Sequence, residues 1–192
     1  MSGVWVDGAR RRVLVLTGTD VHPFDRICAW ADDRARSRID EQIVVQHGYT
    51  PAPRAAGAVM LLTPEELRVA LETADAVVTH GGPGTISTVR AAGHEPIIFP
   101  RDPAHGEHVD EHQLRFAGWA QDRGLGVVVR DVSRLDAAVD TASRTAAAAA
   151  GSAPSPQRSL DALANLMREL ADGRGRRRSL PLLRRARWLQ HH

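Results

Sequence analysis

A glycine-rich turn between two apolar segments carries the groups of this 192-residue chain best suited to bind an anion. The turn, residues 80–84 (His-Gly-Gly-Pro-Gly), follows the apolar run 76–79 and precedes a helical pattern that begins near Thr85. Glycines let a ligand approach the backbone closely, and the free N–H groups of a helix N-terminus attract negative charge. His80 and Thr85 add side-chain donors at the two ends of the turn. The pattern therefore fits either a phosphate-binding turn or a strand–helix turn in which glycine serves geometry alone.

A second group of polar residues lies in the segment 101–113. Residues 108–112 fit the pattern H-x-x-E-H, in which two histidines one helical turn apart bind zinc. We expect no metal here, because no third ligand follows clearly and the pattern would open a helix after a sheet strand. Two interpretations remain: Asp110, His112 and Gln113 hydrogen-bond a hydroxyl-rich ligand, or Asp110 and Glu111 cap a helix whose histidines face solvent.

The rest of the chain alternates short apolar runs with helical patterns, which predicts an α/β fold. We expect strands at 12–17, 43–45, 58–62, 76–79, 96–100 and 126–129. We expect helices from near Asp25, Pro64 and Thr85, and over 109–123 and 135–150. This order predicts a single Rossmann-like domain with a mainly parallel six-stranded sheet and helices on both faces. Ligands of such folds bind at the carboxyl ends of the strands, where the loops 18–24, 80–85 and 101–113 would meet.

Composition divides the chain into a domain and a C-terminal extension. The domain is expected at 1–150, a Gly/Ser/Pro linker at 151–158, and a leucine-striped helix with an Arg-rich tail at 159–192. The tail fits an anionic membrane surface, a solvated disordered terminus or RNA. Because no RNA-binding motif accompanies the charge, we expect no nucleic-acid partner.

Residue usage excludes several kinds of chemistry. The chain has no lysine, which rules out Walker-type phosphate loops, Schiff bases and pyridoxal phosphate anchors. Its single cysteine, Cys28, excludes a disulfide framework and is expected to be buried. We see neither a signal-peptide pattern nor an apolar segment of about 18 residues, so a cytoplasmic protein is expected.

Several motifs together resemble the donor-binding, C-terminal half of GT-B glycosyltransferases. They are Gly18-Thr19, 23–26 (Pro-Phe-Asp-Arg), 79–86 (Thr-His-Gly-Gly-Pro-Gly-Thr-Ile), Pro100-Arg101 and 106–113 (Gly-Glu-His-Val-Asp-Glu-His-Gln). The likeness covers about residues 12–129. The chain is most similar to the small catalytic subunit of bipartite N-acetylglucosaminyltransferases that act on dolichol-linked sugar, and to bacterial exopolysaccharide glycosyltransferase subunits.

The resemblance implies an inverting hexosyl- or N-acetylhexosaminyl-transferase that uses a UDP-sugar, with no cofactor and no essential metal. The residues implied to contact phosphate are Gly18, Thr19, His80, Gly81, Gly82, Gly84 and Thr85. Those implied to read sugar hydroxyls are Asp110, His112 and Gln113, and Arg101 is grouped with the donor-binding residues. His80 is expected to stabilise the departing diphosphate. Relatives often carry a ribose-binding glutamate where this chain has Thr88.

The resemblance also implies a partner, because a GT-B enzyme has two Rossmann-like domains and this chain has room for one. A membrane-associated subunit would supply the acceptor site and the catalytic base, and would recruit this chain to the inner face of the membrane. The acceptor would be a polyprenyl-linked sugar. No base is assigned in this chain, although His22 is expected near the cleft. The alternative is a non-catalytic subunit that binds a nucleotide-sugar or serves as a scaffold.

Overall fold

The computed structural model describes residues 4–5, 8 and 11–142. The end of the predicted domain at 143–150, the predicted linker at 151–158 and the predicted C-terminal helix and tail at 159–192 lie outside the described residues. Within the described part, no helix has the length and apolar character needed to cross a bilayer.

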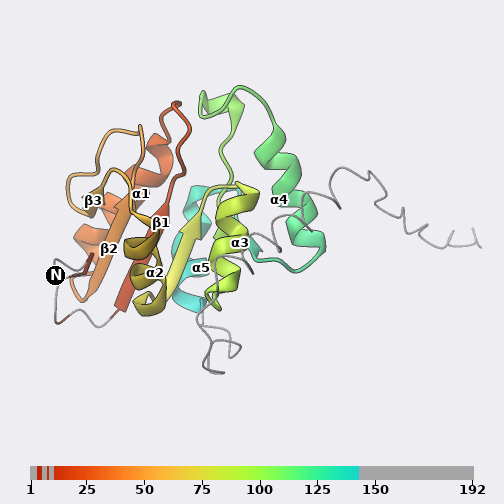
Figure 1. Ribbon diagram of the computed structural model, residues 1–192. Helices are drawn as coiled ribbons and strands as arrows, with labels where there is room; N and C mark the ends of the chain where they lie inside the picture. Colours follow the sequence, from red (N-terminus) through yellow and green to blue (C-terminus); the bar gives the residue numbers. More distant parts are fainter. Residues whose placement is uncertain (1–3, 6–7, 9–10, 143–192) are drawn as a thin grey trace, which may run out of the picture.

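A six-stranded parallel sheet forms the centre of the molecule, with the strand order β3-β2-β1-β4-β5-β6 (Figure 1). The strands are β1 (Arg11–Leu16), β2 (Glu41–Gln46), β3 (Gly57–Val59), β4 (Ala76–Thr79), β5 (Ile97–Ile98) and β6 (Val127–Val128). Val13 on β1 lies opposite Ile43 on β2 and Ala76 on β4, and every neighbouring pair is parallel. The predicted Rossmann-like sheet is therefore confirmed. Successive strands run from β1 to one edge at β3, and the chain then returns to the other side of β1, where β4, β5 and β6 follow toward the opposite edge.

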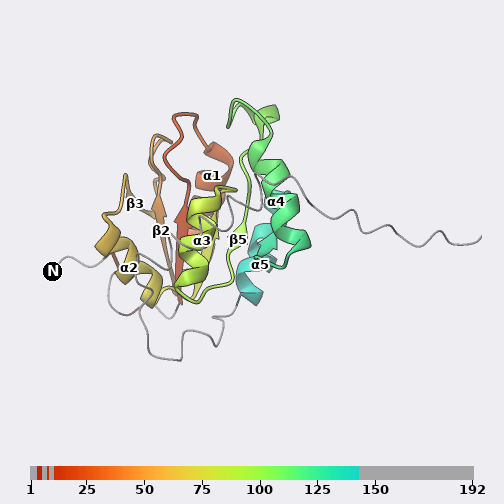
Figure 2. The same ribbon diagram turned by 45° about the vertical axis from the view of Figure 1, so that its right-hand side comes forward.

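Helices cover both faces of the sheet, as predicted (Figure 2). On one face lie α1 (Asp25–Ser37) and α5 (Leu135–Thr141). On the other lie α2 (Pro64–Thr73), α3 (Pro83–Ala91) and α4 (His112–Asp122). Alternate residues of β1 point to opposite faces, so Val13 packs toward α1 whereas Leu14 packs toward α2. Both side chains are fully buried, which explains why the central strands are continuous apolar runs.

Buried charge holds α1 and α5 together at the edge of this core. The Arg34 side chain, 1% exposed, forms ion pairs with Glu41 at 2.7 Å, Asp136 at 2.8 Å and Asp140 at 2.5 Å. Because the guanidinium of Arg34 on α1 forms ion pairs with carboxylates of β2 and α5, it links α5 to α1.

The start of α4 corrects one expectation. The helix was expected from Val109, but it begins at His112. The carboxylate of Asp110 accepts a hydrogen bond from the main-chain N–H of His112 at 2.9 Å, and such an Asx turn competes with helix formation. His108 therefore lies outside the helix, and the spacing that would place it one turn from His112 is lost.

Candidate functional site

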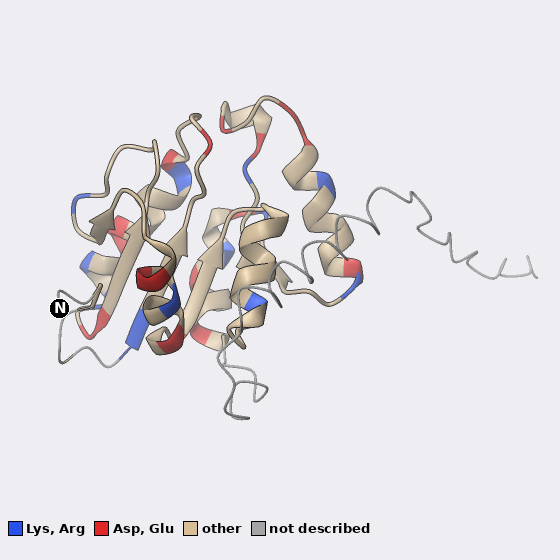
Figure 3. Ribbon diagram, viewed as in Figure 1, with Lys and Arg blue, Asp and Glu red and all other residues tan. Residues whose placement is uncertain are grey.

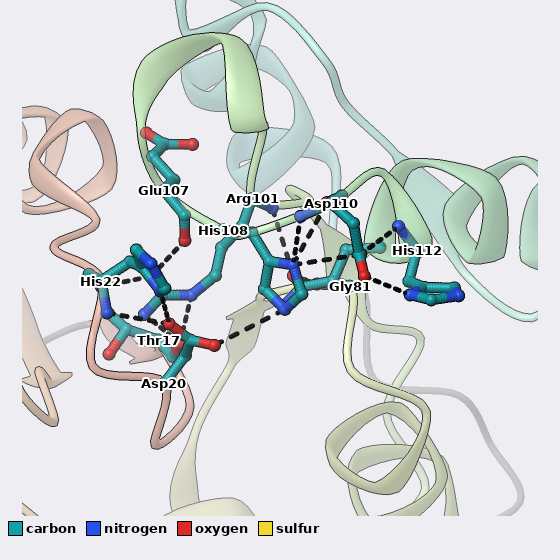
Figure 4. Close-up of polar contacts among 10 residues, drawn as sticks. Thr17, Asp20, His22, Gly81, Arg101, Glu107, His108, Asp110 and His112 are labelled. Carbon is teal, nitrogen blue, oxygen red and sulfur yellow. Dashed lines mark hydrogen bonds and ion pairs between the residues drawn. The ribbon is translucent and has the colours of Figure 1, made fainter.

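Three loops meet at the carboxyl end of the sheet, as the sequence predicted. They connect β1 to α1, β4 to α3, and β5 to α4 (Figure 4). Most of the predicted donor-binding residues lie on these loops or on the first turns of α3 and α4. Buried side chains hold these loops in place, and the groups that face solvent lie above them.

Arg101 lies beneath the site and fixes two of these loops. It is 0% exposed, and its guanidinium donates to the carbonyls of Thr17 at 3.0 Å, His22 at 2.6 Å and Glu107 at 3.0 Å. Burial lowers the pKa of Arg101, and the negative charges of Asp20 and Glu107 oppose that effect. The observed contacts give Arg101 a positioning role, and direct contact with a donor stays a prediction.

Two aromatic rings and a second arginine complete this support. The Phe24 and Phe99 rings stack at 5.7 Å between centroids, with Arg101 over Phe24 and Arg26 over Phe99, each at 4.8 Å. Arg26 also forms a bidentate pair with the buried carboxylate of Glu107, at 2.7 and 2.6 Å. Sequence reasoning missed these supporting roles, because Arg26 and Glu107 lie 81 residues apart and no local pattern pairs them.

Gln113 clamps the start of the glycine-rich turn. Its side-chain oxygen accepts hydrogen bonds from the main-chain N–H groups of Gly81 at 3.0 Å and Arg101 at 3.2 Å. A Cβ at Gly81 would lie only 3.0 Å from Gln113 and 3.1 Å from Pro100, so the close approach requires glycine there. The amide oxygen is thus committed to the backbone, and contact of the amide N–H groups with a sugar hydroxyl stays a prediction.

The N-terminus of α3 is free to bind an anion. Gly82 caps the helix without a side-chain hydrogen bond, and the first turn holds no acidic residue. The only charged residue of α3 is Arg90 in its last turn. Figure 3 shows where acidic and basic residues lie along the ribbon. A Cβ added at Gly84 would meet no atom within 4 Å. The main-chain N–H groups of Gly84 and Thr85 therefore offer donors in an open position, as the helix dipole favours.

Thr88 and Thr19 are placed differently from each other. The Thr88 hydroxyl donates to the main-chain oxygen of Gly84 at 3.0 Å, within α3. Thr19 is exposed and follows Gly18, which has a positive φ of 82°. Only a residue without a side chain adopts that backbone conformation at little cost.

The His80 ring fills the space between the first two loops. Its Nδ1 lies 3.3 Å from the main-chain oxygen of Leu16. A Cβ at Gly18 would lie 2.7 Å from the ring, and a Cβ at Gly82 would overlap Nε2. Burial lowers the pKa of His80 to about 4, assisted by the positive charges of Arg101 and His108. His80 is therefore a neutral imidazole near pH 7.

A row of alternating imidazoles and carboxylates crosses the edge of the site (Figure 4). Asp20 binds the His22 ring at 2.6 Å and lies 3.5 Å from His108, while Asp110 lies 3.2 Å from His108 and 2.7 Å from His112. The His112 main-chain N–H and ring lower the pKa of Asp110. Burial would raise the pKa of Asp20, but hydrogen bonds from His22 and the charge of Arg101 hold it below its usual value. Both carboxylates are therefore ionised at neutral pH and accept hydrogen bonds.

Zinc binding by this row would require at least three grouped ligand side chains. In the described part of the chain, no three His, Cys, Asp or Glu side chains are grouped so that they could hold an ion. The His112 ring is turned to Asp110 rather than toward a position shared with His108.

Comparison with known proteins identifies solved structures that share this fold. No curated protein sequence matches the chain. Among solved structures, the glycosyltransferase of kitacinnamycin superposes with a TM-score of 0.54 at 21% identity, over 88% of this chain and 41% of that one. The calicheamicin glycosyltransferase superposes with a TM-score of 0.53 at 21% identity, over 89% of this chain and 44% of that one. This chain thus spans less than half the length of either structure, and the likeness shows a shared fold.

A family model gives the same assignment at the level of sequence. The model of the glycosyltransferase family 28 C-terminal domain matches residues 13–166, which include most of β1 and all the candidate site residues. The fold, the sheet order and this match agree with the motifs that suggested the donor-binding half of a GT-B enzyme. The chain belongs to the glycosyltransferase family 28 C-terminal domain family.

Proposed function

We propose that this domain binds a UDP-sugar at the carboxyl end of its sheet and takes part in transferring the sugar to an acceptor. The diphosphate would lie on the N-terminal turn of α3, between Gly82 and Thr85. The sugar would lie toward α4, where Asp110, His112 and Gln113 offer acceptors and donors to its hydroxyls. No essential metal is needed in this arrangement, because the helix N-terminus and His80 meet the charge that grows on the leaving diphosphate.

One observation carries the proposal. The α3 N-terminus has no acidic residue, no side-chain cap and open space at Gly84, while polar groups of the neighbouring loops converge beside it. Gly84 has no positive φ and no close neighbour, so neither backbone geometry nor packing within the described residues requires glycine there. The family match independently supports sugar transfer as the chemistry of such a site.

The acceptor site is proposed to lie in a second Rossmann-like half. The chain spans 41% and 44% of the two glycosyltransferases it resembles, so more than half of each has no counterpart here. We propose that a membrane-associated partner supplies this half and the catalytic base, in heteromeric synthesis of an exopolysaccharide or glycolipid. The acceptor would be polyprenyl-linked, and the proposed place of action is the inner face of the membrane.

Calorimetric titration tests donor binding directly. The full chain is titrated with UDP, UDP-glucose and UDP-N-acetylglucosamine, with and without Mg²⁺. Micromolar binding that does not need Mg²⁺ is expected. Gly84→Asp should abolish binding by placing a carboxylate against the diphosphate, whereas Ala29→Asp adds the same charge to an exposed position of α1 and should not. Failure of all three ligands to bind the wild-type chain would refute the proposal.

A non-catalytic donor-binding subunit is the second candidate, and Thr88 favours it. Its hydroxyl hydrogen is donated to Gly84, and a single hydroxyl oxygen cannot reproduce the two-oxygen contact of the ribose-binding glutamate of relatives. Alanine substitution of His80 and Gln113 in the complex with its partner separates the two functions. A catalytic subunit should lose turnover even at saturating donor with the partner still bound, whereas a binding subunit should lose donor affinity alone.

A further inference from the structure

We propose that His80 binds the donor's diphosphate in its protonated form, so that donor binding takes up a proton from solution. This inference rests on the proposed function, because it describes how the same site meets the charge of its ligand. It makes donor affinity depend on pH through one residue of the glycine-rich turn.

The position of the His80 ring determines which nitrogen faces the ligand. Nδ1 lies 3.3 Å from the main-chain oxygen of Leu16, and a carbonyl oxygen can only accept, so Nδ1 carries the hydrogen. The ring cannot easily turn away, because it packs against Gly18 and Gly82 at positions where even a methyl group would collide with it. In the neutral ring, Nε2 is therefore the nitrogen with the lone pair.

Nε2 lies beside the proposed diphosphate position. A Cβ at Gly82, the N-cap of α3, would overlap Nε2, so this nitrogen borders the turn whose N–H groups would bind phosphate. Among the described residues, no hydrogen bond to Nε2 is observed; the hydrogen bond observed for the ring is through Nδ1. A lone pair repels phosphate oxygens. The nitrogen can bind them only after it gains a proton and becomes a donor.

The charges around His80 explain why the proton is absent before the donor binds. Burial lowers the pKa of His80 to about 4, Arg101 and His108 add to that effect, and Asp20 opposes it. At pH 7 a group with such a pKa is protonated in roughly one molecule in a thousand. The main-chain oxygen of Leu16 is the other polar group facing the ring.

A bound diphosphate reverses this balance. At an effective dielectric constant of about 20, each negative charge about 4 Å away raises the proton affinity of a group by a factor of roughly 10³. A nucleotide-sugar diphosphate carries two such charges. The protonated form of His80 thereby becomes the main form in the complex at neutral pH.

Calorimetry in two buffers measures the proton directly. The full chain is titrated with UDP-glucose, whose two phosphates have no group that titrates near neutral pH, in Tris and in PIPES at pH 7. These buffers release protons with very different heats, so uptake of about one proton should appear as a buffer-dependent binding heat. The pKa of His80 is about 4 in the free chain and higher in the complex, so donor affinity should fall by up to tenfold for each pH unit between these two values and level off above the pKa of the complex.

Variants and NMR separate His80 from its neighbours. The imidazoles of His22, His108 and His112 lie in the same site, so the proton taken up by the wild type must be assigned to one ring. His80→Gln should bind more weakly and without buffer-dependent heat. His105→Gln, an exposed position on the 3-10 turn before α4, should behave as the wild type. Because His80→Gln could disturb the turn, ¹⁵N NMR of the wild-type ring follows Nε2 as UDP-glucose is added.

The outcomes distinguish this inference from the proposed function. If UDP-glucose binds with no buffer-dependent heat, or Nε2 stays unprotonated in the complex, His80 does not donate to the diphosphate and the inference is wrong, while donor binding stands. The inference also fails if His80→Gln keeps the full proton uptake. If no UDP-sugar binds in any buffer, the proposed function fails and the inference with it.

Discussion

Gly82 and Gly84 lie two residues apart at the start of α3, and a methyl group added to each would meet very different surroundings. At Gly82 it would overlap Nε2 of His80 and lie 2.9 Å from Cδ2. At Gly84 it would meet nothing within 4 Å. If the open space at Gly84 belongs to the ligand, Gly84→Ala should weaken donor binding and preserve the fold, whereas Gly82→Ala should destabilise the fold.

The structure sets the expected magnitudes. Ordinary contacts begin at 3.4 Å, so in Gly82→Ala the His80 ring must move by more than 0.5 Å, the difference from the 2.9 Å contact. Such overpacking costs about 1–3 kcal/mol, or about 2–4 °C in Tm for each kcal/mol. Gly84 lies inside α3, where alanine is favoured over glycine by up to about 1 kcal/mol. Loss of one hydrogen bond to the charged diphosphate costs about 1.5–3 kcal/mol, which is at least tenfold in Kd.

Differential scanning calorimetry and titration with UDP-glucose check both variants. The expected pattern is a Tm for Gly84→Ala equal to or above that of the wild type with at least tenfold weaker binding, and a lowered Tm for Gly82→Ala. Wild-type donor affinity in Gly84→Ala would show that the diphosphate does not approach the backbone there, and would refute the assignment of the α3 N-terminus. An unchanged Tm in Gly82→Ala would show that the His80 ring is not confined as described.

Three further predictions test the supporting structure. Arg101→Met should lower the free energy of unfolding by about 3 kcal/mol in urea titrations, because three buried carbonyls lose their donor; an unchanged midpoint would contradict the positioning role. Burial raises the pKa of Asp32, but three main-chain N–H groups lower it below 3.8 overall, so its stabilisation is present above that pH and lost in acid. Asp32→Asn should therefore be less stable at pH 7 and flatten the loss of stability in acid, whereas the exposed Asp33→Asn should do neither. Burial raises the pKa of the Cys28 thiol to about 12, so at pH 8 iodoacetamide should label it only after unfolding; fast labelling of the native chain would contradict its burial.

Local signals explain the parts of the fold that sequence reasoning placed well. The strand expected at 76–79 is observed as β4 with the same bounds, because a short β-branched run that ends at a glycine-rich turn has few other structures open to it. Likewise, Pro64 and the acidic residues after it start α2, where Thr63 and Glu66 form a capping box. Each of these features depends on residues within one or two turns of chain.

The start of α4 and the role of Arg101 show where such reasoning stops. The helix pattern from Val109 competes with an Asx turn at Asp110, and the turn prevails. The motif containing Arg101 suggested a ligand contact, but its guanidinium donates to Thr17, 84 residues away, and to two other carbonyls. Nothing within a few residues of Arg101 specifies those acceptors.

The sequence by itself determined the alternation of strands and helices, the glycine-rich turn, and the family. These follow from residue spacing and backbone preference, which act over a few neighbouring residues. Only the tertiary structure decided that Arg101 supports the site from below, that Gln113 clamps Gly81, and that His80 is neutral. Such properties depend on burial and on charges brought together from distant segments, because proton affinity and hydrogen-bond pairing are set by neighbours in space rather than along the chain.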